Sequence, residues 1–115
     1  MTRRRTAIYF KDPETGKEPA KLWIETIKDE LVKTKIYVRI QRAEMGNFGD
    51  HKSVGEGLME LRVSVGPGYR VYYALDGKEI ILLILGGDKS TQRKDIALAK
   101  KYLKSHEEKT HGKRK

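Results

Sequence analysis

Two consecutive segments in the second half of the chain carry apolar residues at every other position, and this period constrains the fold more than any other feature. In residues 58–65 the apolar set is Met59, Leu61, Val63 and Val65. In residues 69–75 it is Tyr69, Val71, Tyr73 and Leu75. Because successive side chains of a strand point to opposite faces, the alternation predicts two strands with one face on the core.

Turn residues bound these strands. Gly66-Pro67-Gly68 separates the two segments, and Asp76-Gly77 after the second is typical of a two-residue hairpin turn. Residues 78–85 then form a third strand, which is apolar on both faces along 80–85 and is therefore expected at the centre of the sheet, covered from both sides. Gly86-Gly87 is expected to end it. The three strands make an antiparallel meander.

The rest of the chain is expected to be helical, apart from one strand over residues 6–10. Helical spacing of apolar residues predicts two helices, 19–28 and 30–45, with Pro19 at the first helical position, and a last helix, 91–105, capped by Asp88 or Ser90. Residues 106–115 contain nothing apolar and are expected to be a disordered basic tail. The result is an α+β domain over residues 1–105: a small antiparallel sheet, meander plus N-terminal strand, with two N-terminal helices and one C-terminal helix.

Charge points to a polyanionic partner. Lys and Arg number 25 against 16 Asp and Glu, a net charge of +9, which favours nucleic acid or an acidic protein. The chain has no cysteine, so disulfides, thiolate catalysis and Cys-ligated zinc are excluded. The apolar run behind Met1–Arg5 is too short for a signal peptide, and the longest apolar run, 80–85, is far below the roughly 20 residues that cross a bilayer. A cytoplasmic location without membrane contact is expected.

The polar positions of the two alternating strands are the first candidate site. The alternation places Glu60, Arg62, Arg70 and Tyr72 on one sheet face. Arginine suits a phosphate site because its planar fork binds oxygens in pairs. Glu60 is a candidate general base, although it could equally orient an arginine, and a solvated face with a cross-strand ion pair would explain the same pattern. As surface residues, both arginines should be removable at a cost of no more than about 0.5 kcal/mol.

A second candidate is the Gly-rich segment between the last strand and the last helix. Asp88 precedes Lys89 where the Walker pattern needs glycine, so a nucleotide loop is excluded. An anion site at the helix start, with Lys89 and Arg93 nearby, is still open. An ordinary capped helix explains the segment equally well.

Three further residues could contact RNA. His51 and Lys52 precede the meander, and either could transfer a proton, although a lone surface histidine is often incidental. Tyr72 is a candidate for stacking on a base. His106 and His111 have no partner at ligand spacing, so no metal or other cofactor is expected.

Taken together and in order, three stretches resemble a known family. They are Gly46-Asn47-Phe48-Gly49-Asp50, then Glu60-Leu61-Arg62 followed by Gly66-Pro67-Gly68-Tyr69-Arg70-Val71-Tyr72-Tyr73, and finally Gly86-Gly87-Asp88-Lys89-Ser90-Thr91-Gln92. Over residues 5–104 the chain resembles the phage-related addiction-module killer branch of the RelE/ParE toxin superfamily, close to the HigB-type toxins. Arg70 matches the strand arginine of the superfamily, and Arg62 and Lys89 fall near its other basic positions. Where RelE-like members carry an aromatic residue, this chain has Gln92, Lys94 and Asp95.

The resemblance implies a RelE-like fold and the toxin of a type II toxin–antitoxin module. Such a toxin enters the ribosomal A site and cleaves mRNA without a metal, using the 2′-OH of the RNA as nucleophile. Its partners would be mRNA, the ribosome and a cognate antitoxin, often a helix-turn-helix DNA-binding protein. Two alternatives are a ParE-like inhibitor of DNA gyrase and a non-catalytic module that binds RNA or the ribosome.

Overall fold

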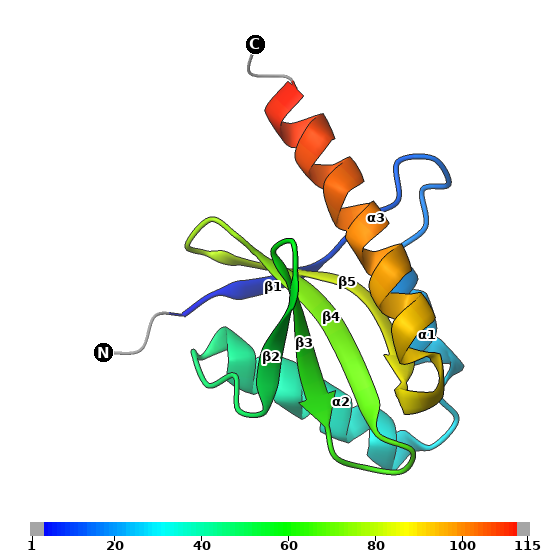
Figure 1. Ribbon diagram of the computed structural model, residues 1–115. Coiled ribbons are helices and arrows are strands. Elements are labelled where there is room, and N and C mark those ends of the chain that lie inside the picture. The colour runs from blue at the N-terminus through cyan, green and yellow to red at the C-terminus, as the bar shows by residue number, and fades with distance from the viewer. Residues whose placement is uncertain (1–3, 113–115) are drawn as a thin grey trace.

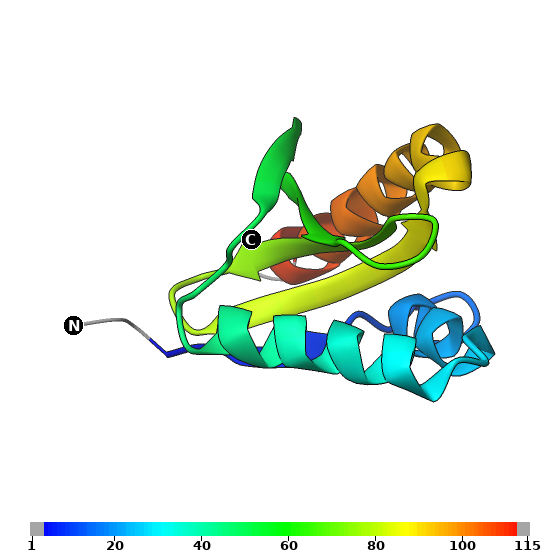
Figure 2. The same ribbon diagram turned by 90° about the horizontal axis from the view of Figure 1, so that it is seen from below.

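In the computed structural model, which describes residues 4–112, a sheet lies between two helical layers (Figure 1). The elements in chain order are β1 (Thr6–Tyr9), α1 (Pro19–Thr26), α2 (Glu30–Glu44), β2 (His51–Gly55), β3 (Leu58–Val63), β4 (Tyr69–Asp76), β5 (Ile80–Asp88), a 3₁₀ turn (Lys89–Thr91) and α3 (Gln92–Gly112). Helices α1 and α2 cover one face and α3 covers the other (Figure 2). The predicted α+β class, with two N-terminal helices and one C-terminal helix, is confirmed, and the arrangement is compatible with a RelE-like fold.

The sheet has five strands in the order β1-β5-β4-β3-β2. Strands β2 to β5 form an antiparallel meander, but β1 runs parallel to β5, with Thr6 opposite Ile80. The prediction of a purely antiparallel sheet is therefore wrong. A strand that reaches its partner through a long connection is free of the antiparallel constraint that a hairpin imposes. Strand β2 was not predicted because its side chains are mostly polar and exposed, so it has no apolar alternation.

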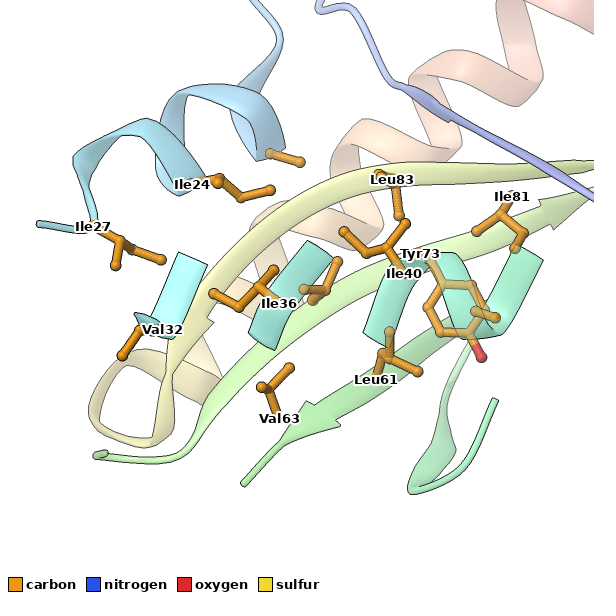
Figure 3. Close-up of a cluster of buried hydrophobic side chains, with 13 residues drawn as sticks. Ile24, Ile27, Val32, Ile36, Ile40, Leu61, Val63, Tyr73, Ile81 and Leu83 are labelled. Atoms are coloured by element: carbon orange, nitrogen blue, oxygen red, sulfur yellow. The ribbon is translucent and has the colours of Figure 1, made fainter. Parts of the chain in front are cut away.

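Apolar side chains are buried on both faces of the sheet. The cluster under α1 and α2 is shown in Figure 3, where Ile24, Ile36 and Ile40 meet Leu61, Tyr73, Ile81 and Leu83. The cluster under α3 comprises Phe10, Leu58, Tyr72, Ala74, Leu82, Ile84, Ala99 and Leu103. The prediction of a central last strand covered from both sides is confirmed. The prediction that β4 buries one face only is wrong, since α3 covers the other, and Leu75 at the strand end is 45% exposed.

Strand β5 does not end at Gly86-Gly87 as predicted but continues through both glycines to Asp88. Neither glycine has a positive φ, so no turn requires them. Glycine is required at both positions because neighbouring side chains leave no room for a β-carbon. A β-carbon at Gly86 would overlap the indole ring of Trp23 on α1, and one at Gly87 would overlap the carboxylate of Asp95 on α3.

The helices begin close to the residues that the sequence predicts, but α1 and α3 end at other residues than predicted. Helix α1 begins at Pro19 as predicted, and the Asp29 carboxylate caps α2 by accepting from the backbone N–H of Leu31 at 2.9 Å. Helix α3 runs to Gly112, so the predicted disordered tail is wrong for residues 106–112, while residues 113–115 lie outside the described part of the chain. A contact of 3.2 Å between His106 Nε2 and Asp76 Oδ2 ties this extension to the end of β4.

The outer edge of β1 is covered by the end of α2. The backbone N–H of Ala7 donates to Glu44 Oε2 at 2.8 Å, and that of Arg5 donates to the Glu44 carbonyl oxygen at 2.7 Å. These bonds satisfy donors that would otherwise offer an open edge to another strand. Within residues 4–112 no helix has the length and apolar character needed to cross a bilayer.

Candidate functional site

A buried carboxylate, Glu60 on β3, joins two arginines and a glutamine. Glu60 is 0% exposed. Its Oε2 accepts from Arg62 Nε at 3.2 Å, and its Oε1 accepts from Gln92 Nε2 at 2.7 Å and lies 3.2 Å from Arg70 Nε. An unpaired charge in this position would cost several kcal/mol, about 3 to 5 if one partner of a buried pair were lost. These contacts are therefore what allows a carboxylate to be buried here, and we call Glu60, Arg62, Arg70 and Gln92 the Glu60 cluster.

Strand register brings the cluster together. Glu60 lies opposite Tyr72 and Arg62 lies opposite Arg70. These four strand residues therefore share one face of the sheet, as the alternation predicted. That face is not simply solvated, because α3 covers part of it. The Arg62 side chain is 37% exposed and that of Arg70 is 12% exposed. The expectation that both arginines can be removed at a cost of no more than about 0.5 kcal/mol is therefore revised for both. Loss of Arg62 would leave the buried Glu60 Oε2 without its donor, and loss of Arg70 would remove an ion-pair partner of Oε1.

Both guanidinium groups turn their Nε side toward Glu60. Arg62 makes a directed hydrogen bond there, whereas the Arg70 contact is an ion pair, since no acceptor in the described part of the chain is aligned for a hydrogen bond from its Nε. Arg70 is also held by a bond from its Nη1 to the Gly68 carbonyl at 3.0 Å. Arg62 Nη1 lies 3.7 Å from Asp50 Oδ1. The guanidinium groups of Arg62 and Arg70 are thus oriented by their contacts with Glu60, Asp50 and the Gly68 carbonyl.

Further basic residues border the cluster. Lys52 on β2 lies directly opposite Glu60 and is exposed. Lys89 is exposed at the turn that precedes α3, and a β-carbon added at Gly68 would lie 3.7 Å from Arg70 Nη1 and 4.0 Å from Lys89 Cβ. Arg93 is exposed on the first turn of α3. The predicted basic residues from β2, β3, β4 and the start of α3 therefore gather on one side of the sheet, which favours an anionic ligand.

Two predicted RNA contacts are not placed where the sequence suggested. Tyr72 is 0% exposed within the cluster under α3, so the prediction that its ring stacks on a base is wrong. Burial, followed by the negative charges of Glu60 and Asp95, raises the pKa of Tyr72 well above its usual value. His51 lies on the other face of the sheet, where its ring is 5.6 Å from that of Phe48 and its Nδ1 is 2.8 Å from the Gly49 carbonyl oxygen.

The start of the last helix is capped by the chain itself. Asp88 Oδ1 accepts from the backbone N–H of Ser90 at 2.8 Å, and hydrogen bonds from the Ser90 side chain and backbone lower the pKa of Asp88. A carboxylate already occupies the place that an anion would take. Of the two interpretations of this segment, the ordinary capped helix is the one the geometry favours.

The sequence patterns did not indicate that Gln92 contacts Glu60 or that Arg39 contacts the backbone of Arg62. Arg39 on α2 donates from Nε to the Arg62 carbonyl and from Nη2 to the Asp50 carbonyl, both at 3.0 Å. Asp50 belonged to a recognised motif, but periodicity says nothing about contacts between residues so far apart. In residues 4–112 no three His, Asp or Glu side chains gather as a metal site.

The amino-acid sequence matches a known protein family. The model of the phage-derived Gp49-like protein family (DUF891) matches residues 23–104, a span that includes the whole Glu60 cluster. An uncharacterized protein of Haemophilus influenzae is 50% identical over 78 residues, which are 68% of this chain and 79% of that protein. The chain therefore belongs to the Gp49-like family of phage-derived proteins, a toxin-like family of addiction modules related to the RelE and HigB toxins.

Proposed function

We propose that this protein is the toxin of a type II toxin–antitoxin module and that it cleaves mRNA on the ribosome as a metal-independent endoribonuclease. The observation that carries the proposal is the pairing of Arg62 and Arg70 on one carboxylate. A gyrase inhibitor that acts by binding alone needs no such convergence. Two oriented guanidinium groups suit a phosphate that gains negative charge during reaction.

RNA supplies its own nucleophile for this reaction. The 2′-hydroxyl gives up its proton to solvent as its oxygen attacks the adjacent phosphorus, and the bond from phosphorus to the 5′-oxygen breaks. The products are a 2′,3′-cyclic phosphate and, once the leaving oxygen takes up a proton, a 5′-hydroxyl. Arg62 and Arg70 stabilise the charge on the pentacoordinate phosphorane. Lys52 lies on the same face and can donate a proton to the leaving 5′-oxygen. Glu60 orients the arginines in this scheme, because both of its oxygens have partners and neither is exposed.

Mapping of RNA ends in a translation extract tests the proposal. We expect cuts with 5′-hydroxyl ends in mRNA that is being translated, and none in naked RNA at the same protein concentration, because the ribosome positions the substrate for this small set of groups. Equal cutting of naked RNA would defeat ribosome dependence. Inhibition of DNA supercoiling by gyrase, with intact mRNA, would replace the proposal by the ParE-like alternative.

The cognate antitoxin is expected to mask the basic side of the sheet with an acidic segment. Charge reversal by Lys52→Glu or Lys89→Glu should then weaken the toxin–antitoxin complex about tenfold or more, measured by calorimetry at low salt. Lys104→Glu, at an exposed position on α3, is the matched control and should have a smaller effect. Equal affinity for all three variants would show that neutralisation does not act by masking these charges.

A further inference from the structure

We propose that Gln92 is a positioning residue, which holds the Glu60 carboxylate in the rotation that lets Arg62 and Arg70 present their outer N–H groups to a single tetrahedral oxyanion. The inference rests on the proposed function only for the identity of that oxyanion as the scissile phosphate of RNA. Its other premises are contacts within the Glu60 cluster.

The position of Gln92 is set by a well-defined element. It is the first residue of α3 and follows a 3₁₀ turn that Asp88 caps. Its Nε2 donates to Glu60 Oε1 at 2.7 Å, across 32 residues of sequence. Because Glu60 has no exposed surface, water does not compete for that oxygen. A hydrogen bond to an ionised acceptor in such a place is stronger than an ordinary one.

Rotation of the Glu60 carboxylate controls both arginines. Arg62 Nε contacts Oε2, whereas Arg70 Nε contacts Oε1. The terminal torsion of a glutamate side chain has a broad energy profile, so the carboxylate can rotate unless something fixes it. The bond from Gln92 fixes Oε1, and with it Oε2. Loss of that bond frees both oxygens to move away from the two guanidinium groups.

The fixed carboxylate decides which part of each guanidinium is available. Nε is turned inward on both side chains, Arg70 Nη1 donates to the Gly68 carbonyl and Arg62 Nη1 lies near Asp50, so the Nη2 groups are the ones left for a ligand. Pairs of such groups match the oxygens of a phosphate in spacing and plane. Gln92 therefore acts on the ligand through Glu60 and the arginines, without touching it.

Binding of inorganic sulfate by the whole protein tests the inference, since sulfate is a tetrahedral oxyanion with a constant charge over the pH range used. The Nε–H resonances of Arg62 and Arg70 report the binding by NMR. Gln92→Met has a similar length and no donor, and we expect it to bind sulfate about tenfold more weakly, the equivalent of about 1.4 kcal/mol. The control is Gln41→Met at an exposed position on α2, which should bind like the original protein.

A second variant gives a signature that a purely structural role would not produce. In Gln92→Glu the new carboxyl group faces Glu60, and burial together with the neighbouring charge raises its pKa. While the pair shares one proton, the O–H can replace the donor of Gln92, and once that proton is lost the two carboxylates repel. Sulfate affinity should therefore be close to the original at low pH and fall as pH rises, whereas the original protein should show no such fall.

The outcomes separate the inference from the proposed function. Equal sulfate affinity of Gln92→Met and Gln41→Met, or a Gln92→Glu variant whose affinity does not depend on pH, would overturn the positioning role. If Gln92→Met does not fold, the pH profile of Gln92→Glu decides alone. If the variants behave as expected but the original protein leaves translated mRNA intact, the positioning role stands and the endoribonuclease proposal fails. In an active protein, Gln92→Met should lower kcat about tenfold with little change in KM.

Discussion

Replacing Arg70 with alanine is expected to slow cleavage of translated mRNA by about 100-fold or more, the usual scale for a preoriented donor at a developing charge. Expression of the variant should no longer arrest growth. The change also removes an ion-pair partner of the buried Glu60, but Gln92 and Arg62 still donate to it, so the free energy of unfolding should fall by only about 1 to 3 kcal/mol. Single-turnover cleavage in a translation extract and a urea melt measure the two effects.

Two other variants show whether the loss is chemical. Arg62→Ala should lose activity on a similar scale and also destabilise the protein by about 1 to 3 kcal/mol, because the buried Glu60 Oε2 loses its hydrogen-bond donor. Leu82→Ala, in the cluster under α3, should cost about 2 to 5 kcal/mol through its cavity while leaving the Glu60 cluster in place. If the arginine variants are folded and still fully toxic, the catalytic assignment is wrong.

Gly86→Ala is expected to destabilise the protein by about 3 kcal/mol, a large value for the addition of one methyl group. The reason is the overlap between the new β-carbon and the indole ring of Trp23, which packs directly on the backbone of β5. Neither a buried strand nor a large ring can yield without disturbing its neighbours. The melting temperature should fall by about 10 °C, measured by circular dichroism.

A double variant identifies the cause of that loss. Combining Gly86→Ala with Trp23→Leu should cost less than the sum of the two single changes, because the smaller side chain leaves room for the β-carbon. Gly16→Ala is the comparison, since a β-carbon there meets nothing within 4 Å and only the positive φ of 74° is unfavourable, at about 1 kcal/mol. Additive costs for Gly86 and Trp23 would show that their contact is not the source.

Local sequence patterns predicted where the strands and helices lie along the chain. They did not predict which elements pack against one another. The alternation in β3 and β4 and the apolar β5 correspond to observed strands. The hairpin at Asp76-Gly77 is also present, but its predicted two-residue turn is wrong: Asp76 pairs with Ile80 and the loop is residues 77–79. The direction of β1 was missed, because pairing between distant segments leaves no local trace. The pattern predicts a strand end at Gly86-Gly87, because it does not reveal that the Trp23 ring on α1 and the Asp95 carboxylate on α3 pack against these two positions.

The candidate site was likewise predicted only in part. Strand period placed Glu60, Arg62 and Arg70 on one face, and the register bears this out. It did not reveal that α3 covers that face, so Tyr72 was expected at the surface although it is buried. Gln92 carries no pattern of its own and becomes informative only once α3 lies against β3.

The parallel pairing of β1 with β5 also governs when the chain can assemble during synthesis. Thr6 is made early but its partner, Ile80, is made late, and closing such a long loop carries an entropic cost that slows folding. Strand β1 can contact the end of α2 early, but it cannot join the sheet until β5 has left the ribosome. Gln92 emerges later still. A nascent chain that stops short of α3 would carry both arginines without the bond that fixes the carboxylate between them.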